Sequence, residues 1–147
     1  MIQIEYPNLP LRIEVKNDVR KVFCLVRKKW IVLTPEEWVR QHFLSYLINT
    51  LKYPVSLIAV EKLLKVGTRN RRTDIVVYKD QFPFLLIECK HMDHPLTNRE
   101  LDQTLHYFSA IQCPYWVITN GAQTHGYLKT ETQLQPLSVL PEFDSKY

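Results

Sequence analysis

Residues 73–95, TDIVVYKDQFPFLLIECKHMDHP, contain two apolar runs separated by a polar segment. Runs of Val, Ile, Leu and Phe bounded by polar turn residues are typical of β-strands, so this stretch predicts a β-hairpin. Three ionisable residues interrupt the apolar pattern. Asp74 lies at the start of the first run, and Glu88 and Lys90 lie at the end of the second. Ionisable residues in strands otherwise suited to a core suggest a functional site, such as a metal-binding or catalytic site.

The pairing of this hairpin decides whether the two carboxylates meet. Side chains alternate faces along a strand, so Glu88 and Lys90 project from the same face. A hairpin symmetric about Gln81 places opposed side chains on one face. Its predicted pairs are Tyr78 with Phe84, Val76 with Leu86, and Asp74 with Glu88. Because both faces are apolar, a slip by one residue, which would turn Asp74 to the other face, stays open.

Two interpretations of the three ionisable residues follow. Two carboxylates 4 Å apart repel by about 4 kcal/mol at an effective dielectric near 20, and a divalent cation would turn that cost into binding. Mg²⁺ prefers oxygen ligands, which Asp74, Glu88 and the Cys89 main-chain carbonyl can supply, with Mn²⁺ as an alternative ion. Lys90 can then act on the attacking water, which predicts phosphodiester hydrolysis. In the second interpretation, Lys90 merely neutralises Glu88 in a structural ion pair.

The bulk composition sets limits on the class of protein. The chain has 147 residues, 46% of them hydrophobic, which predicts one ordered domain over residues 1–147. The formal charge of +4 favours polyanionic partners. The N-terminus has no signal-peptide pattern and no stretch is long and apolar enough to span a membrane, so we expect a cytoplasmic protein that does not bind membranes.

Helix and strand signals place the hairpin within a fold. Thr34, Pro35 and Glu37 form a capping box that starts a helix ending before Lys52. A second capping box at Thr97 starts a helix that stops before Pro114. Two or three short strands are expected before residue 34, another at 55–64, and a strand pair around the Asn-Gly turn at 120–121. This order predicts an α/β fold in which helices cover a mixed sheet.

Several short motifs together resemble a known nuclease group. They are RRTDIVVY around Asp74, LLIECK with Glu88 and Lys90, QTLHY with Gln103 and Tyr107, and VITNG after the second helix. In this order and spacing, from about residue 30 to 130, the chain resembles the PD-(D/E)XK nuclease superfamily. It is most similar to the N-terminal nuclease domain of type I restriction enzyme R subunits.

The resemblance implies a fold and a set of roles. The implied fold is a restriction-endonuclease-like central mixed sheet flanked by helices, here with a β-rich N-terminal extension. Asp74 and Glu88 are implied to hold Mg²⁺ and Lys90 to be catalytic. Gln103 and Tyr107 match a Gln-x-x-x-Tyr motif implied to position the site and DNA. On the second helix, residues Leu101, Leu105, Phe108 and Ile111 form the predicted buried stripe, with Gln103 and Tyr107 at its edge.

The first helix offers two candidates for a further acid of the site. Glu36 shares a helix face with Arg40 and Phe43, whereas Glu37 points aside and belongs to the capping box. The spacing of Glu36, Val39 and Arg40 also resembles the family's first motif. We favour Glu36, and the choice between the two stays open.

DNA contacts are predicted in the connector KVGTRNRRT that precedes Asp74. Arg69, Arg71 and Arg72 can grip phosphates through their guanidinium groups, with Tyr107 beside them. The alternative is an ordinary solvated loop.

The resemblance leads us to expect DNA as a partner, and either restriction-modification subunits or a second copy of the chain as a protein partner. The sequence has no GxxxxGK[ST] phosphate loop, so we expect no translocase activity. A free-standing homologue, an isolated domain and a degenerate relative all stay open. The leading expectation is a Mg²⁺-dependent DNA endonuclease, and the alternative is an inactive nucleic-acid-binding or interaction module on the same fold.

Overall fold

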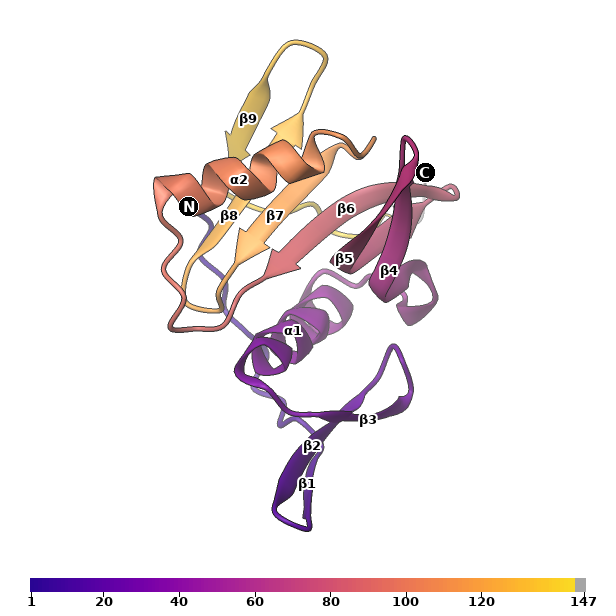
Figure 1. The fold of residues 1–147 in the computed structure, drawn as a ribbon, viewed down its shortest axis with the longest axis vertical. Helices are drawn as coiled ribbons and strands as arrows, with labels where there is room; N and C mark the ends of the chain where they lie inside the picture. Colours follow the sequence, from indigo (N-terminus) through magenta and orange to yellow (C-terminus); the bar gives the residue numbers. More distant parts are fainter. Residues whose placement is uncertain (145–147) are drawn as a thin grey trace.

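The computed structural model describes residues 1–144, so the last three residues of the predicted domain lie outside the described part. Within residues 1–144 the chain forms a six-stranded mixed sheet, a separate three-stranded sheet and the helices α1 and α2 (Figure 1). This arrangement confirms the predicted α/β fold with a β-rich N-terminal extension.

The larger sheet contains the predicted hairpin as two of its inner strands. Its strands are β4 (Ile58–Val66), β5 (Arg69–Lys79), β6 (Phe82–Cys89), β7 (Tyr115–Thr119), β8 (Thr124–Lys129) and β9 (Leu134–Leu137), paired in that order. Strands β6 and β7 are parallel and the other neighbours are antiparallel. Parallel strands need a crossover connection, and α2 (Asn98–Phe108) provides it. The short edge strand β9 was not predicted.

The N-terminal residues form the smaller sheet and lead into α1. The expected N-terminal strands are β1 (Ile13–Lys16), β2 (Val19–Cys24) and β3 (Lys29–Val32), and the structure pairs them antiparallel. Helix α1 (Pro35–Ser45) begins at Thr34, whose side chain accepts a hydrogen bond from the Glu37 N–H at 3.0 Å. It continues as a π-helical turn (Tyr46–Thr50) and ends before Lys52, and a 3₁₀ turn (Val55–Leu57) precedes β4. The smaller sheet lies beyond α1 from the larger one (Figure 1).

Two hydrophobic clusters bury opposite faces of the larger sheet. Odd-numbered residues of β5 and β6, such as Ile75 and Cys89, pack in one cluster with Phe43 of α1. Even-numbered residues, such as Val76 and Leu86, pack in the other cluster with Phe108 of α2. The Cys89 side chain therefore points away from the face that carries Glu88. Alternation along β6 positions Glu88 and Lys90 on the α2 side.

The register of the β5–β6 hairpin agrees with the prediction near the site and differs near the turn. Val76 pairs with Leu86 as predicted, which excludes the one-residue slip. Tyr78 pairs with Pro83 instead of Phe84, because the register shifts between Val77 and Tyr78. The turn is a two-residue one with Asp80 and Gln81 at φ 51° and 70°, the left-handed conformation that favours tight hairpins. Its centre lies between these two residues and not on Gln81.

The basic connector predicted at residues 65–73 is part of a long hairpin. Leu64 pairs with Arg71 and Val66 with Arg69 across a tight turn at Gly67, where φ is 61°. Leu64 and Val66 pack against the cluster at the end of α2. The backbone is therefore held by ladder hydrogen bonds and by burial on one side, which a sequence rich in Arg and Lys did not reveal.

Candidate functional site

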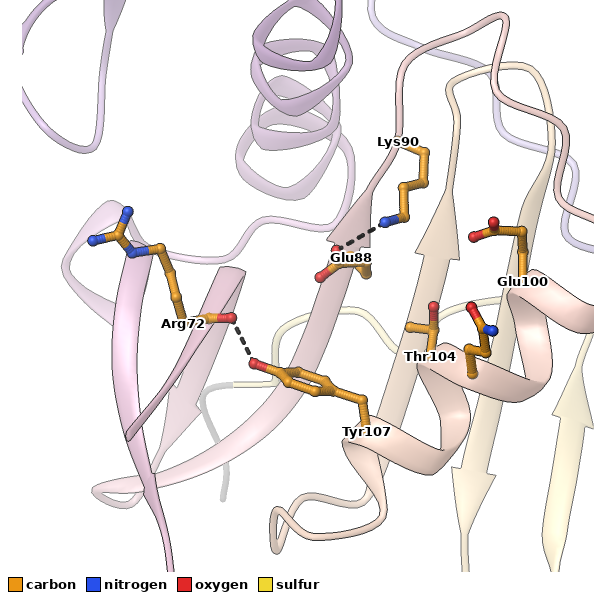
Figure 2. Close-up of a pocket in the computed structure, with 7 residues that line it drawn as sticks. Arg72, Glu88, Lys90, Glu100, Thr104 and Tyr107 are labelled. Atoms are coloured by element: carbon orange, nitrogen blue, oxygen red, sulfur yellow. Dashed lines mark hydrogen bonds and ion pairs between the residues drawn. The ribbon is translucent and has the colours of Figure 1, made fainter. Parts of the chain in front are cut away.

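A pocket of about 320 Å³ opens on the α2 side of the sheet, at the end of β6. Its lining residues come from three elements and the segment after β6, and are Arg72, Glu88, Lys90, Glu100, Gln103, Thr104 and Tyr107 (Figure 2). The structure thus brings the predicted residues Glu88, Lys90, Gln103 and Tyr107 to one cavity.

Glu88 and Lys90 form the charged floor of this pocket. Lys90 Nζ lies 3.6 Å from Glu88 Oε1, and the two side chains are 30% and 22% exposed. Burial and the negative charge of Asp74 together raise the pKa of Glu88 to about 8, and Lys90 acts in the opposite direction. The Lys90 N–H donates to the Thr119 carbonyl at 2.8 Å, which fixes the end of β6 on β7. With a pKa of about 8, the Glu88 carboxyl is mostly protonated at neutral pH in the metal-free protein.

Asp74, in β5, contacts both α1 and the end of β6. Its Oδ1 accepts a hydrogen bond from Arg40 Nη2 at 2.8 Å, and its Oδ2 accepts one from the Cys89 N–H at 2.7 Å. The carboxylate acts on Glu88 through its charge, and the residues that line the pocket do not include it. Each oxygen of an ionised carboxylate has a second lone pair, so these two hydrogen bonds orient Asp74 without saturating it.

The two acids of the first helix have different environments. The Glu37 carboxylate is buried and contacts Arg40 Nη1 at 2.6 Å and Arg27 Nη2 at 2.7 Å. The side chain of Glu36 is 47% exposed and lies 3.5 Å from Arg40 Nη2. Partial burial raises the pKa of Glu36, and the charge of Asp74 raises it further, while Arg40 and Lys90 lower it. Glu36 therefore shares the electrostatic field of the site, and Glu37 is held by arginines behind it.

Glu61 is a neighbour of the site that the sequence did not reveal. It sits in β4 between residues that pair with Thr73 and Ile75, and so lies opposite Asp74. Its φ is 53°, a left-handed conformation that a non-glycine residue adopts at some cost. Its carboxylate lies 3.5 Å from Arg27 Nη1 and 3.8 Å from Arg40 Nη2. A single acid within an apolar strand was the only available signal in the sequence.

Helix α2 contributes one face to the pocket. Glu100, Gln103, Thr104 and Tyr107 follow the i, i+3, i+4, i+7 spacing that places residues on one side of a helix. The same spacing, extended from Gln103 and Tyr107, would have found Glu100 and Thr104. The Glu100 carboxylate also lies 3.3 Å from His94 Nε2, which ties the helix start to the loop after β6.

Tyr107 connects α2 to the basic hairpin. Its hydroxyl donates to the main-chain carbonyl of Arg72 at 2.7 Å, and the Arg71 guanidinium carbon lies 5.3 Å from the centre of its ring. Figure 2 shows the Arg72 side chain pointing away from the pocket while its carbonyl faces Tyr107. Arg69, Arg71 and Arg72 are all exposed on β5. Of these three predicted DNA contacts, Arg72 is among the residues that line the pocket, and Arg71 has its guanidinium over the ring of Tyr107, which also lines it.

The donor groups can be compared with what a metal ion requires. Within residues 1–144 no group of three or more His, Cys, Asp or Glu side chains is arranged to hold a metal. The predicted set differs, since it combines two carboxylates with the Cys89 main-chain carbonyl, a donor set suited to Mg²⁺. Burial and the negative charge of Asp74 raise the pKa of Glu88, and a bound divalent cation would favour its ionised form. In donor chemistry the set fits such an ion.

The remaining findings concern membranes and known proteins. No helix within residues 1–144 is long and apolar enough to cross a membrane. No curated protein matches the chain. The family model described as the N terminus of the type I restriction enzyme R protein matches residues 35–143, from the first residue of α1 to beyond β9. The match spans well over half of the sequence, and the chain therefore belongs to the family of type I restriction enzyme R protein N-terminal regions.

Proposed function

We propose that the chain is a Mg²⁺-dependent DNA endonuclease of the PD-(D/E)XK superfamily. The observation that carries this proposal is the meeting of three ionisable groups at the end of β6. Glu88 and Lys90 share the pocket, and the charge of Asp74 raises the pKa of Glu88. Such perturbed carboxyl groups in a polar cavity are more frequent at functional sites than elsewhere.

Each residue of the set has a proposed role. Asp74, Glu88 and the Cys89 carbonyl would hold Mg²⁺ or Mn²⁺, which when bound supplies a water of lowered pKa and a Lewis acid. Lys90 Nζ, at 3.6 Å from Glu88 Oε1, would orient or deprotonate the attacking water, or stabilise the negative charge that develops on the phosphoryl group. Glu36 adds a further carboxylate, and Gln103 and Tyr107 contact the DNA from α2.

The β4–β5 hairpin is the proposed DNA-binding arm. Between residues 62 and 73 it carries Lys62, Lys65, Arg69, Arg71 and Arg72 and no acidic residue. Arg and Lys side chains bind the phosphate backbone without reading sequence. The arm lies beside the pocket because Tyr107 holds the main chain of Arg72. DNA, restriction-modification subunits and a second copy of the chain are the proposed partners.

A non-catalytic nucleic-acid-binding module is the second candidate. It is favoured by the contacts of Asp74, whose two oxygens already accept hydrogen bonds from Arg40 and the Cys89 N–H. A protein of this kind would use the basic hairpin alone. It would bind DNA without any requirement for a metal ion and would not cleave it.

The test combines metal binding with cleavage. Mg²⁺ and Mn²⁺ are titrated by calorimetry into the wild type and Asp74→Ala, and the same samples are incubated with supercoiled and single-stranded DNA. Asp93→Ala, an exposed acid of the loop after β6, is the matched control. Metal binding and metal-dependent nicking that are lost only in Asp74→Ala support the nuclease. A folded wild type that shifts DNA in a gel but binds no metal supports the second candidate.

A further inference from the structure

A chain of ion pairs runs from the N-terminal sheet to Asp74. Arg27, in the turn between β2 and β3, places Nη2 2.7 Å from Glu37 Oε2. Glu37 Oε1 lies 2.6 Å from Arg40 Nη1, and Arg40 Nη2 lies 2.8 Å from Asp74 Oδ1. The side chains of Glu37 and Arg40 are only 5% and 6% exposed, so these contacts are shielded from solvent.

Arg27 is itself held in place on two sides. Its backbone N–H and its Nε both lie 3.4 Å from the buried sulfur of Cys24, which accepts both hydrogen bonds. Its Nη1 lies 3.5 Å from Glu61 Oε2. The guanidinium fork thus bridges Glu37 of α1 and Glu61 of β4, a contact that a planar group with several donors can make and an ammonium cannot.

The arrangement gives Arg40 a divided set of partners. Its Nη2 lies near Asp74 at 2.8 Å, Glu36 at 3.5 Å and Glu61 at 3.8 Å, and its Nη1 serves Glu37. Arg27 and Arg40 both contact Glu37 and Glu61. Because Arg27 balances part of the charge of these two acids, the Nη2 of Arg40 can make its shortest contact with Asp74. Without Arg27, two carboxylates would lose a cation and would compete with Asp74 for Arg40, because a buried charge without a partner is costly.

We propose that Arg27 is a positioning residue of the candidate site, which acts through Glu37 and Arg40 to fix the orientation of the Asp74 carboxylate. Arg27 lies before residue 35, where the family match begins, so the N-terminal extension contributes to the site. The inference rests on the proposed function for its importance to catalysis, but the orientation of Asp74 can be measured without metal or DNA.

The readout is the backbone amide of Cys89, which donates to Asp74 Oδ2 at 2.7 Å. Its proton chemical shift is recorded by NMR on the metal-free protein. In Arg27→Gln the Cys89 amide proton is expected to move upfield as the hydrogen bond lengthens. The Lys90 amide, which donates to Thr119, is expected to stay unchanged as an internal reference. Lys28→Gln, an exposed cation of the same turn, removes the same charge and is expected to leave both amides in place.

Further variants test the route and protect against loss of folding. Arg27→Lys keeps the charge but not the fork, so it is expected to fold and to move the Cys89 amide in the same direction by less. In an Arg40→Lys protein, Arg27→Gln is expected to cause little additional shift, because the path is already broken.

A Cys89 amide unmoved in folded Arg27→Gln or Arg27→Lys overturns the inference, as does a shift of undiminished size in the Arg40→Lys background. Nicking assays on the wild type test the proposed nuclease separately, so the two failures can be told apart.

Discussion

Arg40 of α1 and Asp74 of β5, which are 34 positions apart in the sequence, form an ion pair with 2.8 Å between Nη2 and Oδ1. The charge of Asp74 raises the pKa of the already strongly basic Arg40, after the opposing effect of burial, so this cation is permanent. The pair joins the helix on one face of the sheet to β5, the strand that pairs with β6 beside the candidate site. Because Glu36 and Glu37 also contact Arg40, the pair brings the acids of the first helix close to Asp74 although they are distant in sequence.

The two acids of α1 are expected to respond differently to substitution. Glu37→Gln removes the buried charge between Arg27 and Arg40 and is expected to lower the free energy of unfolding by about 3–5 kcal/mol. Glu36→Gln changes a side chain that is 47% exposed and is expected to alter stability by less than about 0.5 kcal/mol while reducing nicking. Urea unfolding and a supercoiled-DNA assay on both variants measure this. Equal loss of stability in the two would contradict the separation of roles.

The raised pKa of Glu88 predicts a pH dependence of stability in metal-free buffer. Its pKa is about 8 in the folded protein, well above the ordinary value of 4.5, so the folded state binds more protons than the unfolded state between these values. Its contribution is therefore full below pH 4.5 and is lost as the pH rises through 8. Thermal melts from pH 5 to 9 in chelator are expected to show this fall, and Glu88→Gln is expected to flatten it. A variant with the same slope as the wild type would show that another group is responsible.

Lys90 is expected to be needed for cleavage and not for metal binding. Lys90→Gln removes the group proposed to act on water, and loss of such a group costs about 10²–10⁴-fold in rate. It also removes a positive charge that lowers the pKa of Glu88, so the fall in stability with pH should move to higher pH. Calorimetry with Mn²⁺ checks metal binding, nicking rates check cleavage, and the pH series of thermal melts checks the shift in stability, all on one preparation. Loss of metal binding together with activity would assign Lys90 a structural role.

Arg71 and Arg72 provide a matched pair within the basic hairpin. Changing either residue to Gln is expected to reduce the slope of log K against log salt by about one, because each is proposed to neutralise one phosphate. Only Arg71, which lies over the Tyr107 ring at 5.3 Å, is expected to slow cleavage of bound DNA as well. Filter binding across a salt series and single-turnover nicking distinguish binding from cleavage. If both variants slowed cleavage equally, the hairpin would have to change its orientation when DNA binds, so that Arg72 also reaches the site.

The sequence was informative where local rules dominate. Capping residues located both helices, and alternation in the apolar hairpin put Glu88 and Lys90 on one face and the Cys89 side chain on the other. It failed where pairing between distant segments decides the structure. The basic connector became two paired strands because Leu64 and Val66 found a hydrophobic partner at the end of α2, which no local pattern encodes.

The candidate site shows the same division. The acids and the lysine could be identified because charges in apolar strands are conspicuous. The ion pairs of the arginines could not be predicted. Arg27 resembles an ordinary surface residue in the sequence, and the helix face assigned to Arg40 did not reveal its ion pair with Asp74. Glu37 was predicted as a capping residue, and only its backbone has that role.

Tyr107 is expected to act as the anchor of the basic hairpin. Its hydroxyl donates to the Arg72 carbonyl at 2.7 Å, so Tyr107→Phe removes one hydrogen bond and leaves the ring in place. A loss of about 0.5–1.5 kcal/mol in stability is expected, the usual net value of such a bond. Amide exchange by mass spectrometry should show faster exchange in residues 62–73 and unchanged exchange in β7. Tyr127→Phe, a tyrosine of β8 in the same hydrophobic cluster, is the control and should leave the hairpin protected. If Tyr107→Phe weakens DNA cleavage without changing exchange in the hairpin, the hydroxyl acts on the substrate and not on the position of the arm.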